Sequence, residues 1–196
     1  CAEESWNAGS DVVVFPEYLW MLLAPLVPGG DQVRGVARLF WESVWPELLV
    51  KLSRPDKAVV LGTVPCLLPD GTLRNRAPIL CGGRILFQDK LNLTPWEDVF
   101  RGGDAIHLWR FKGATFAVLV CLDIEVPELA VALRGRGVDA ILVPSATESL
   151  LGLERIGRCA SARSVELCCY VGVAHLTGNA QSELVDKNVG RAAWFT

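Results

Sequence analysis

The sequence has few histidines, no surplus of basic residues and no long apolar run. Only two histidines occur among the 196 residues, which disfavours Ser-His-Asp and Cys-His enzymes because their nucleophile needs an imidazole base. The net charge of −3 leaves no basic excess to neutralise phosphates, so we expect no nucleic-acid partner. The charge-free stretch from Tyr18 to Gly30 is shorter than the ~20 residues of a membrane span and contains Pro25 and Pro28. We therefore predict no transmembrane helix and no membrane partner.

Common metal, nucleotide and hydrolase motifs are also missing. The chain contains no GxSxG, HExxH, P-loop or GxGxxG segment. Its seven cysteines are irregularly spaced and form no CxxC pair, so we predict no disulfide framework, no metal site and no cofactor. This cysteine usage is typical of a reducing compartment, which predicts a cytoplasmic protein in which six of the seven thiols are small buried hydrophobes.

The composition and the alternation of patterns indicate one globular α/β (or α+β) domain. Hydrophobic residues make up 51% of the chain and charged residues 21%, which is unlike a disordered protein. Apolar runs predict strands at 11–15, 58–64, 106–111, 115–121, 139–143 and 169–174, and two strands within 77–87. Helical spacing predicts helices at 33–52, interrupted or kinked at Pro46, and at 127–136 and 153–167.

Both ends of the chain look incomplete as domain ends. Residue 1 enters a helical pattern, and the chain stops at Trp194-Phe195-Thr196 within a strand-like run. A domain rarely ends on an apolar aromatic pair unless that pair is docked. We therefore expect residues 1–196 to form a single, partial domain of a longer protein.

Three reactive groups follow strand-like runs. Cys121 ends the run 116–120 and precedes a helix start at Pro127, where the helix field favours a thiolate, although a buried cysteine that merely finishes a strand fits equally well. Glu17 and Lys90 also follow apolar runs, and each taken singly could be a surface residue. Together they supply a base, an ammonium and a thiol, which form a coherent active site that needs no histidine.

The segments around these residues resemble the nitrilase, or carbon–nitrogen hydrolase, superfamily. The resemblance rests on three ordered blocks and covers residues 11–178; the blocks are Phe15-Pro16-Glu17-Tyr18, Asp89-Lys90-Leu91-Asn92-Leu93-Thr94-Pro95-Trp96-Glu97 and Cys121-Leu122-Asp123-Ile124-Glu125-Val126-Pro127-Glu128. Supporting matches are Asn75, Gly102-Gly103-Asp104 and Ala162-Arg163-Ser164-Val165-Glu166. The segments 93–97 and 178–179 are most similar to the branch often fused to an acetyltransferase domain.

The resemblance implies a four-layer α-β-β-α sandwich and hydrolysis of a non-peptide carbon–nitrogen bond through a cysteine thioester. It implies that Glu17 deprotonates Cys121, that Lys90 and the backbone N–H of Leu122 hold the oxyanion, and that Glu97 orients the substrate. It implies a small-molecule amide or nitrile as the partner, and a homodimer or higher homo-oligomer. No metal or cofactor enters this chemistry.

Two alternatives to an amidase remain open at this stage. One is a nitrilase that converts a nitrile to an acid, and the other is a non-catalytic family member that acts as a binding or assembly module. Retention of Glu17, Lys90 and Cys121 argues against the second. Departures from the family pattern at Leu122 and Val126 leave the substrate open. Among the seven thiols, we expect Cys121 to be alkylated fastest, and we expect Asp123 and Glu125 to brace its turn.

Overall fold

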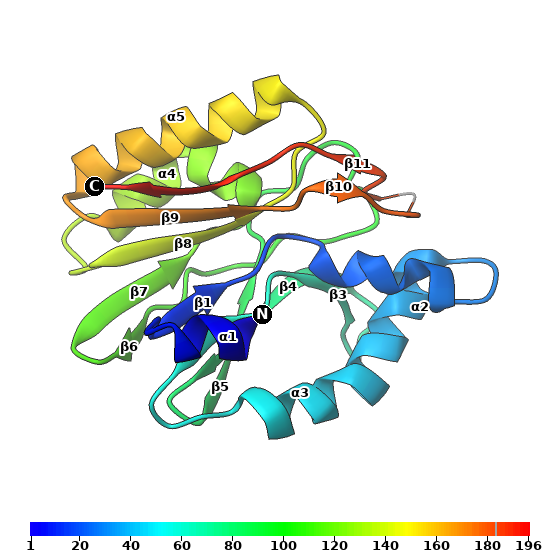
Figure 1. The fold of residues 1–196 in the computed structure, drawn as a ribbon. Helices are drawn as coiled ribbons and strands as arrows, with labels where there is room; N and C mark the ends of the chain where they lie inside the picture. The colour runs from blue at the N-terminus through cyan, green and yellow to red at the C-terminus, as the bar shows by residue number, and fades with distance from the viewer. Residues whose placement is uncertain (183) are drawn as a thin grey trace.

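Two β-sheets lie face to face between two layers of helices (Figure 1). The computed structural model describes residues 1–182 and 184–196. The first sheet has the order β1-β2-β4-β3, with β5 on the other edge of β4. Its strands are β1 (Val12–Val14), β2 (Ala58–Val60), β3 (Val64–Leu67), β4 (Leu73–Cys81) and β5 (Arg84–Asp89). β1 runs parallel to β2, and the other pairs are antiparallel.

The second sheet has the order β12-β9-β8-β7-β6, with a parallel centre and antiparallel edges. Its strands are β6 (Trp109–Phe111), β7 (Ala114–Val118), β8 (Ala140–Ser145), β9 (Tyr170–His175) and β12 (Ala192–Phe195). A separate two-stranded ribbon pairs β10 (Gly178–Asn179) with β11 (Lys187–Asn188). The parallel centre places the ends of β7 and β8 at one edge of the sheet.

Helices cover the outer face of each sheet. The first sheet is covered by α1 (Ala2–Asn7), the 3₁₀ helix η1 (Leu19–Leu26), α2 (Gln32–Leu39), the π-helical turn η2 (Phe40–Val44) and α3 (Trp45–Leu52). The second is covered by η3 (Cys121–Glu125), α4 (Pro127–Leu133) and α5 (Leu150–Leu167). This is the α-β-β-α order that the resemblance to the nitrilase superfamily implies. No helix in the described chain combines the length and apolarity that crossing a membrane requires.

The alternation of side chains along each strand supplies both the central and the outer core. Val60 and Ile79 point into the space between the sheets, where they join Val118 and Leu142 of the second sheet. Val59, one residue away, lies on the opposite face in a cluster with Ala2, Trp6, Leu61 and Leu80, against which α3 packs. Strands that are buried on both faces therefore read as continuous apolar runs.

Several predicted boundaries differ from the structure. The predicted strand 58–64 is two strands, because the chain leaves the sheet at 61–63 before β3 begins. Only 109–111 of the predicted strand 106–111 is extended in the sheet, and the predicted helix 127–136 ends at Leu133. The predicted interruption near Pro46 is present, but it is the π-helical turn at 40–44 that precedes this proline. Pro46 itself lies in the first turn of α3, where its missing N–H costs nothing.

The cysteines are less uniformly buried than the sequence predicts. All seven are free thiols. Cys66, Cys81, Cys121 and Cys169 are buried, whereas Cys1 and Cys168 are exposed. The expectation of six buried thiols is therefore wrong, and so is the expected burial of Cys168. Cys168 adopts a left-handed conformation (φ 50°) as the C-cap of α5, and this turn directs it away from the core.

Candidate active site

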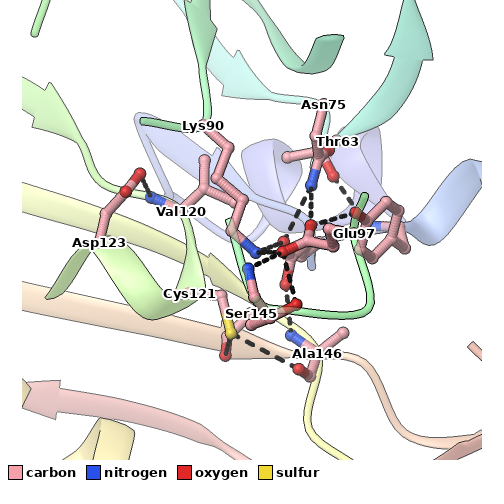
Figure 2. A network of polar contacts seen from close by, with 12 residues as sticks. Thr63, Asn75, Lys90, Glu97, Val120, Cys121, Asp123, Ser145 and Ala146 are labelled. Carbon is pink, nitrogen blue, oxygen red and sulfur yellow. Dashed lines mark hydrogen bonds and ion pairs between the residues drawn. The ribbon is translucent and has the colours of Figure 1, made fainter. Parts of the chain in front are cut away.

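Glu17, Lys90 and Cys121 come together although they follow three different strands, β1, β5 and β7. Figure 2 shows Lys90, Cys121 and Ala146 in this cluster. Lys90 Nζ lies 2.8 Å from Glu17 Oε1. The backbone N–H of Ala146 donates to Glu17 Oε2 at 3.1 Å, and the thiol of Cys121 donates to the carbonyl of the same Ala146 at 3.5 Å. Glu17 and Lys90 are each 1% exposed and Cys121 is 7% exposed. The cluster is therefore a buried one with its thiol nearest to solvent.

A close backbone contact positions Glu17. A Cβ added to Gly62 would lie 2.0 Å from the carbonyl oxygen of Pro16, so only glycine fits where the chain leaves β2. The next residue, Thr63, accepts a hydrogen bond at its Oγ1 from the N–H of Tyr18 at 2.9 Å. Tyr18 has a φ of 55°, which makes a sharp turn directly after Glu17. The break in the predicted strand 58–64 thus serves to hold the turn that carries Glu17.

A second close contact positions Lys90. The N–H of Lys90 donates to the carbonyl of Asn75 at 2.9 Å, and the N–H of Gly103 donates to the carbonyl of Lys90 at 2.8 Å. A Cβ on Gly102 would lie 2.4 Å from the carbonyl oxygen of Leu91. The glycine pair at 102–103 therefore lets one loop pass directly against the backbone that presents the lysine.

Glu97 lies behind Lys90 and is 0% exposed. Its Oε2 accepts from Lys90 Nζ at 2.8 Å and from the N–H and Oγ1 of Thr94 at 2.8 and 2.9 Å. Its Oε1 accepts from the hydroxyl of Tyr18 and from Asn75 Nδ2. Protein donors thus engage both oxygens, and the carboxylate holds Lys90. The expected contact of Glu97 with a substrate stays a prediction.

Cys121 begins η3 in a left-handed conformation with a φ of 49°. Asp123 holds this turn, because its carboxylate accepts hydrogen bonds from the N–H of Val120 at 3.0 Å and of Asn92 at 2.7 Å. This is the bracing that the sequence predicts, and it also ties the turn to the loop after Lys90. Ser145 Oγ donates to Cys121 Sγ at 3.3 Å, a contact that the sequence does not signal.

The electrostatics of the thiol differ from the sequence-based expectation. Burial, and after it the negative charge of Glu17, raise the pKa of Cys121 to about 12. The thiol is therefore protonated at rest, because burial outweighs the start of the short helix. Of the two possibilities that the sequence left open for Cys121, this favours the buried thiol over the thiolate. Burial also raises the pKa of Glu17 to about 7, against the attraction of Lys90. Glu17 is thus a carboxyl group that can take up and release a proton near neutral pH.

Lys90 stays charged in spite of its burial. Burial by itself lowers the pKa of a lysine, but the negative charges of Glu17 and Glu97 outweigh it and raise the pKa of Lys90. For Glu97 the two effects act in the opposite directions. Burial raises its pKa, but the charge of Lys90 and the surrounding hydrogen-bond donors outweigh burial and lower the pKa below its usual value. Lys90 and Glu97 therefore form a fixed ion pair beside the titratable Glu17.

A cavity of about 190 Å³ opens onto Cys121. Cys121 and Leu122 form part of its wall, together with Thr94, Trp96, Glu125, Ala146, Thr147, Glu148, Ser149, Gly152, Arg155, Ile156, Val185 and Asn188. Glu125 and Arg155 form an ion pair there, with Arg155 Nε 2.9 Å from Glu125 Oε2. Across residues 1–182 and 184–196, no group of three or more His, Cys, Asp or Glu side chains could hold a metal ion.

The structure resembles solved nitrilases along nearly its whole length. Nit3 of Saccharomyces cerevisiae, described as a member of branch 10 of the nitrilase superfamily, superposes with a TM-score of 0.76 at 23% identity, over 98% of this chain and 72% of that one. A mutant of an amidase from Nesterenkonia sp. AN1, solved in complex with butyramide, has a TM-score of 0.72 at 20% identity, over 98% and 72% of the two chains. No family model matches the sequence.

Two curated proteins also match the sequence. A probable hydrolase, YhcX of Bacillus subtilis (strain 168), is 29% identical over 199 aligned positions, which cover 96% of this chain and 38% of that protein. An (R)-stereoselective amidase of a Pseudomonas species is 32% identical over 136 positions, covering 68% of this chain and 47% of the enzyme. The chain belongs to the nitrilase superfamily. It spans less than half the length of these two curated relatives.

Membership of the nitrilase superfamily confirms the resemblance read from the three sequence blocks and the fold class that it implies. The three sequence blocks supplied Glu17, Lys90 and Cys121 as candidate site residues. What the blocks did not supply is Ala146, because a backbone N–H and carbonyl leave no mark on a sequence. Its position could have been inferred from the parallel strand 139–143, whose end must lie at the same sheet edge as that of the strand before Cys121.

Proposed function

We propose that this chain carries the active site of an amidase, which hydrolyses the carbon–nitrogen bond of small carboxamides through a thioester on Cys121. The observation that carries the proposal is the buried cluster in which Lys90 Nζ lies 2.8 Å from Glu17 and the backbone of Ala146 contacts both Glu17 and the thiol. The amidase from a Pseudomonas species among the curated relatives, and the amidase structure with butyramide, support the choice of an amide.

The first step is attack of Cys121 Sγ on the amide carbon. Glu17 removes the thiol proton as the carbon–sulfur bond forms, because a thiol with a pKa of about 12 does not ionise by itself near neutral pH. The negative charge that develops on the amide oxygen is stabilised by the ammonium of Lys90 and the N–H of Leu122. Glu17 then delivers its proton to the nitrogen, and the carbon–nitrogen bond breaks to release ammonia or an amine.

The second step is hydrolysis of the thioester. Glu17 is a carboxylate again after the amine departs, and it removes a proton from a water molecule that attacks the thioester carbon. The oxyanion forms at the same place beside Lys90, and collapse breaks the carbon–sulfur bond. The acid leaves, and the proton held by Glu17 returns to Sγ. Glu97 holds Lys90 in place through both steps, at 2.8 Å.

Turnover of a simple amide tests the proposal. We expect the full chain to release ammonia from butyramide, and Cys121→Ala to remove this activity while the protein stays folded. Cys66→Ala is the matched control, since Cys66 is as buried as Cys121 (both 7% exposed) and lies outside the cavity. Mass spectrometry of a rapidly quenched reaction should show a butyryl adduct on Cys121. Wild-type rates in Cys121→Ala would contradict the mechanism.

The same assay with butyronitrile tests the alternative of a nitrilase, which would release ammonia from the nitrile. Absence of any covalent adduct or turnover with both compounds would favour a non-catalytic binding or assembly module. The homo-oligomer implied by the resemblance is a separate proposal, and light scattering of the full chain measures it directly.

A further inference from the structure

Ser145, the last residue of β8, places a hydroxyl group in a fully buried position. Ile141, Val143 and Ser145 lie on one face of this strand, because successive side chains of a strand point to opposite faces, and all three are 0% exposed. The first two side chains are apolar. A hydroxyl group removed from water costs free energy unless it finds a hydrogen-bond partner. The partner of Ser145 therefore indicates what this polar residue does at the end of an apolar strand.

That partner is the sulfur of Cys121, which lies 3.3 Å from Ser145 Oγ (Figure 2). No other described residue forms a hydrogen bond with this hydroxyl. The two residues meet because Cys121 follows β7 and Ser145 ends β8, and the ends of parallel neighbouring strands lie at the same edge of a sheet. The tertiary structure thus brings a hydroxyl group directly onto the nucleophile.

The second neighbour of the sulfur fixes the direction of this hydrogen bond. The thiol of Cys121 also lies 3.5 Å from the carbonyl oxygen of Ala146, which can only accept, so the thiol proton points there. The sulfur then accepts from the hydroxyl of Ser145, which is the donor. The sulfur is therefore held between an acceptor for its proton and a donor for its lone pair.

Backbone hydrogen bonds hold Ser145 in place. The N–H of Leu176 donates to the carbonyl of Ser145 at 2.8 Å, and the N–H of the next residue, Ala146, donates to Glu17 Oε2 at 3.1 Å. β8 itself is the central strand of its sheet, with β7 and β9 on its two sides. A donor that is fixed before the reaction needs no reorganisation when charge develops on its acceptor.

The hydrogen bond from Ser145 is strongest when the sulfur carries negative charge. Burial and the charge of Glu17 raise the pKa of Cys121, and the charge of Lys90 and the hydrogen bond from Ser145 act against them. Charge develops on the sulfur when the thiol loses its proton during attack, and again when the carbon–sulfur bond of the thioester breaks. Hydrogen bonds to charged acceptors are roughly twice as strong as those between neutral groups. The bond therefore stabilises the transition state more than the resting thiol.

We propose that Ser145 is a further catalytic residue, whose hydroxyl donates to Cys121 Sγ as negative charge forms on the sulfur and as the sulfur leaves the thioester. This inference rests on the proposed amidase function and adds a residue to its mechanism. The proton stays on Ser145 Oγ throughout, because Glu17 takes the thiol proton, so Ser145 makes and breaks no covalent bond. It lies behind the sulfur, outside the lining of the 190 Å³ cavity, and does not contact the substrate.

Ser145→Ala removes the donor and leaves a smaller side chain, so access to the sulfur is kept. We expect kcat of the full chain for butyramide to fall about tenfold with an unchanged KM, because the lost bond strengthens only in the transition state. The acid limb of the pH profile should stay near pH 7, since Ser145 does not contact Glu17. A kcat within about twofold of the wild type, a raised KM with unchanged kcat, or a displaced acid limb would overturn the proposal.

Ser164→Ala is the matched control. Ser164 is 2% exposed, and its hydroxyl donates within α5 to the carbonyl of Ser161 at 2.8 Å, outside the cavity. Both variants lose one buried hydroxyl group, but only Ser145→Ala loses a donor to the sulfur. Urea denaturation should show both chains folded, and kcat should be unchanged in the control. Equal losses of kcat in the two variants, or a Ser145→Ala chain that does not fold, would assign Ser145 a structural role and overturn the proposal.

Alkylation separates this proposal from the amidase function, because iodoacetamide reacts with the thiolate and needs no amide substrate. Peptide mass spectrometry follows Cys121 apart from the other free thiols. A less stabilised thiolate is also more nucleophilic, so at a fixed pH we expect Cys121 to react about threefold more slowly in Ser145→Ala than in the wild type or Ser164→Ala. Slower alkylation would support Ser145 as a donor even if butyramide is not hydrolysed. Equal or faster alkylation would overturn it.

Discussion

Glu17 and Glu97 are two buried carboxylates that share one lysine and yet behave in opposite ways. Each is at most 1% exposed, and each has an oxygen 2.8 Å from Lys90 Nζ. Burial raises the pKa of Glu17 to about 7, whereas the charge of Lys90 and several donors lower the pKa of Glu97. Equal solvent exposure and a shared cation therefore do not decide the protonation of a carboxyl group.

The difference comes from the deeper burial of Glu17 and from the other neighbours of the two carboxyl groups. Glu97 sits in a tight turn in which Thr94 donates twice to Oε2, and Tyr18 donates to Oε1. Glu17 receives bonds from Asn75 and from the N–H of Ala146, and it also feels the negative charge of Glu97. Hydrogen bonds to the charged form stabilise it, and a like charge opposes it. The comparison separates a carboxylate that holds a lysine from one that can exchange a proton.

The largest effect is expected from Glu17→Gln, because this substitution leaves an isosteric group that cannot accept a proton. We expect kcat/KM for butyramide to fall by about 10²–10⁴-fold, the usual contribution of general acid–base catalysis. The fold should persist, because glutamine can still accept from Ala146. Steady-state kinetics measure kcat/KM, and circular dichroism shows whether the variant stays folded. A loss of less than tenfold would mean that another group removes the thiol proton.

The pH dependence of kcat/KM tests whether Glu17 and Glu97 are coupled. With Glu17 as the base, kcat/KM of the wild type should rise with pH and level off above an apparent pKa near 7, because only the deprotonated carboxyl can accept the thiol proton. Glu97→Gln removes the negative charge that helps to raise the pKa of Glu17, so this acid limb should move to lower pH. An acid limb that stays in place in Glu97→Gln would show that the two carboxylates are not coupled.

Glu97→Gln also tests the structural side of the pair. Removing one charge of a buried ion pair destabilises a protein by about 3–5 kcal/mol, and because Glu17 still pairs with Lys90 we expect the lower end of that range. Urea denaturation at pH 8 measures the free energy of unfolding. Glu47→Gln is the control, since its bridge to Lys51 is largely exposed and should contribute little.

Tyr18→Phe removes one donor to Glu97 and leaves the ring in place. Hydrogen bonds to charged groups contribute about 1.5–3 kcal/mol, so the free energy of unfolding should fall by that amount. The pKa of Glu97 should move up toward its ordinary value, and kcat should fall by less than in Glu17→Gln. A Tyr18→Phe variant as stable as the wild type would mean that the hydroxyl does not support Glu97.

The smallest expected effect is that of Thr94→Val. It removes the hydroxyl donor but keeps the N–H that donates to the same Oε2, so a loss of about 0.5–1.5 kcal/mol in the free energy of unfolding is expected. Thr94→Ser keeps the hydroxyl and should restore most of this stability. A Thr94→Val variant as stable as the wild type would mean that the hydroxyl does not support Glu97, and a loss in Thr94→Ser alone would assign the effect to packing of the Thr94 methyl group.

Local patterns predicted most of the fold. The apolar runs at 139–143 and 169–174 match β8 and β9 within two residues, and Pro127 begins α4 as expected. The prediction of one continuous strand at 58–64 is wrong because the interruption depends on the contact between Gly62 and Pro16, which are 46 positions apart in the chain. Periodicity in a short window carries no information about such a contact.

The sequence by itself determined the family and most of the strands, and it predicted Glu17, Lys90 and Cys121 as site residues, because ordered motifs and apolar runs are written in it directly. Only the tertiary structure decided the protonation of these groups, the thiol of Cys121 above all. Its pKa depends on burial and on the charge of Glu17, which lies 104 positions away in the chain (121 − 17).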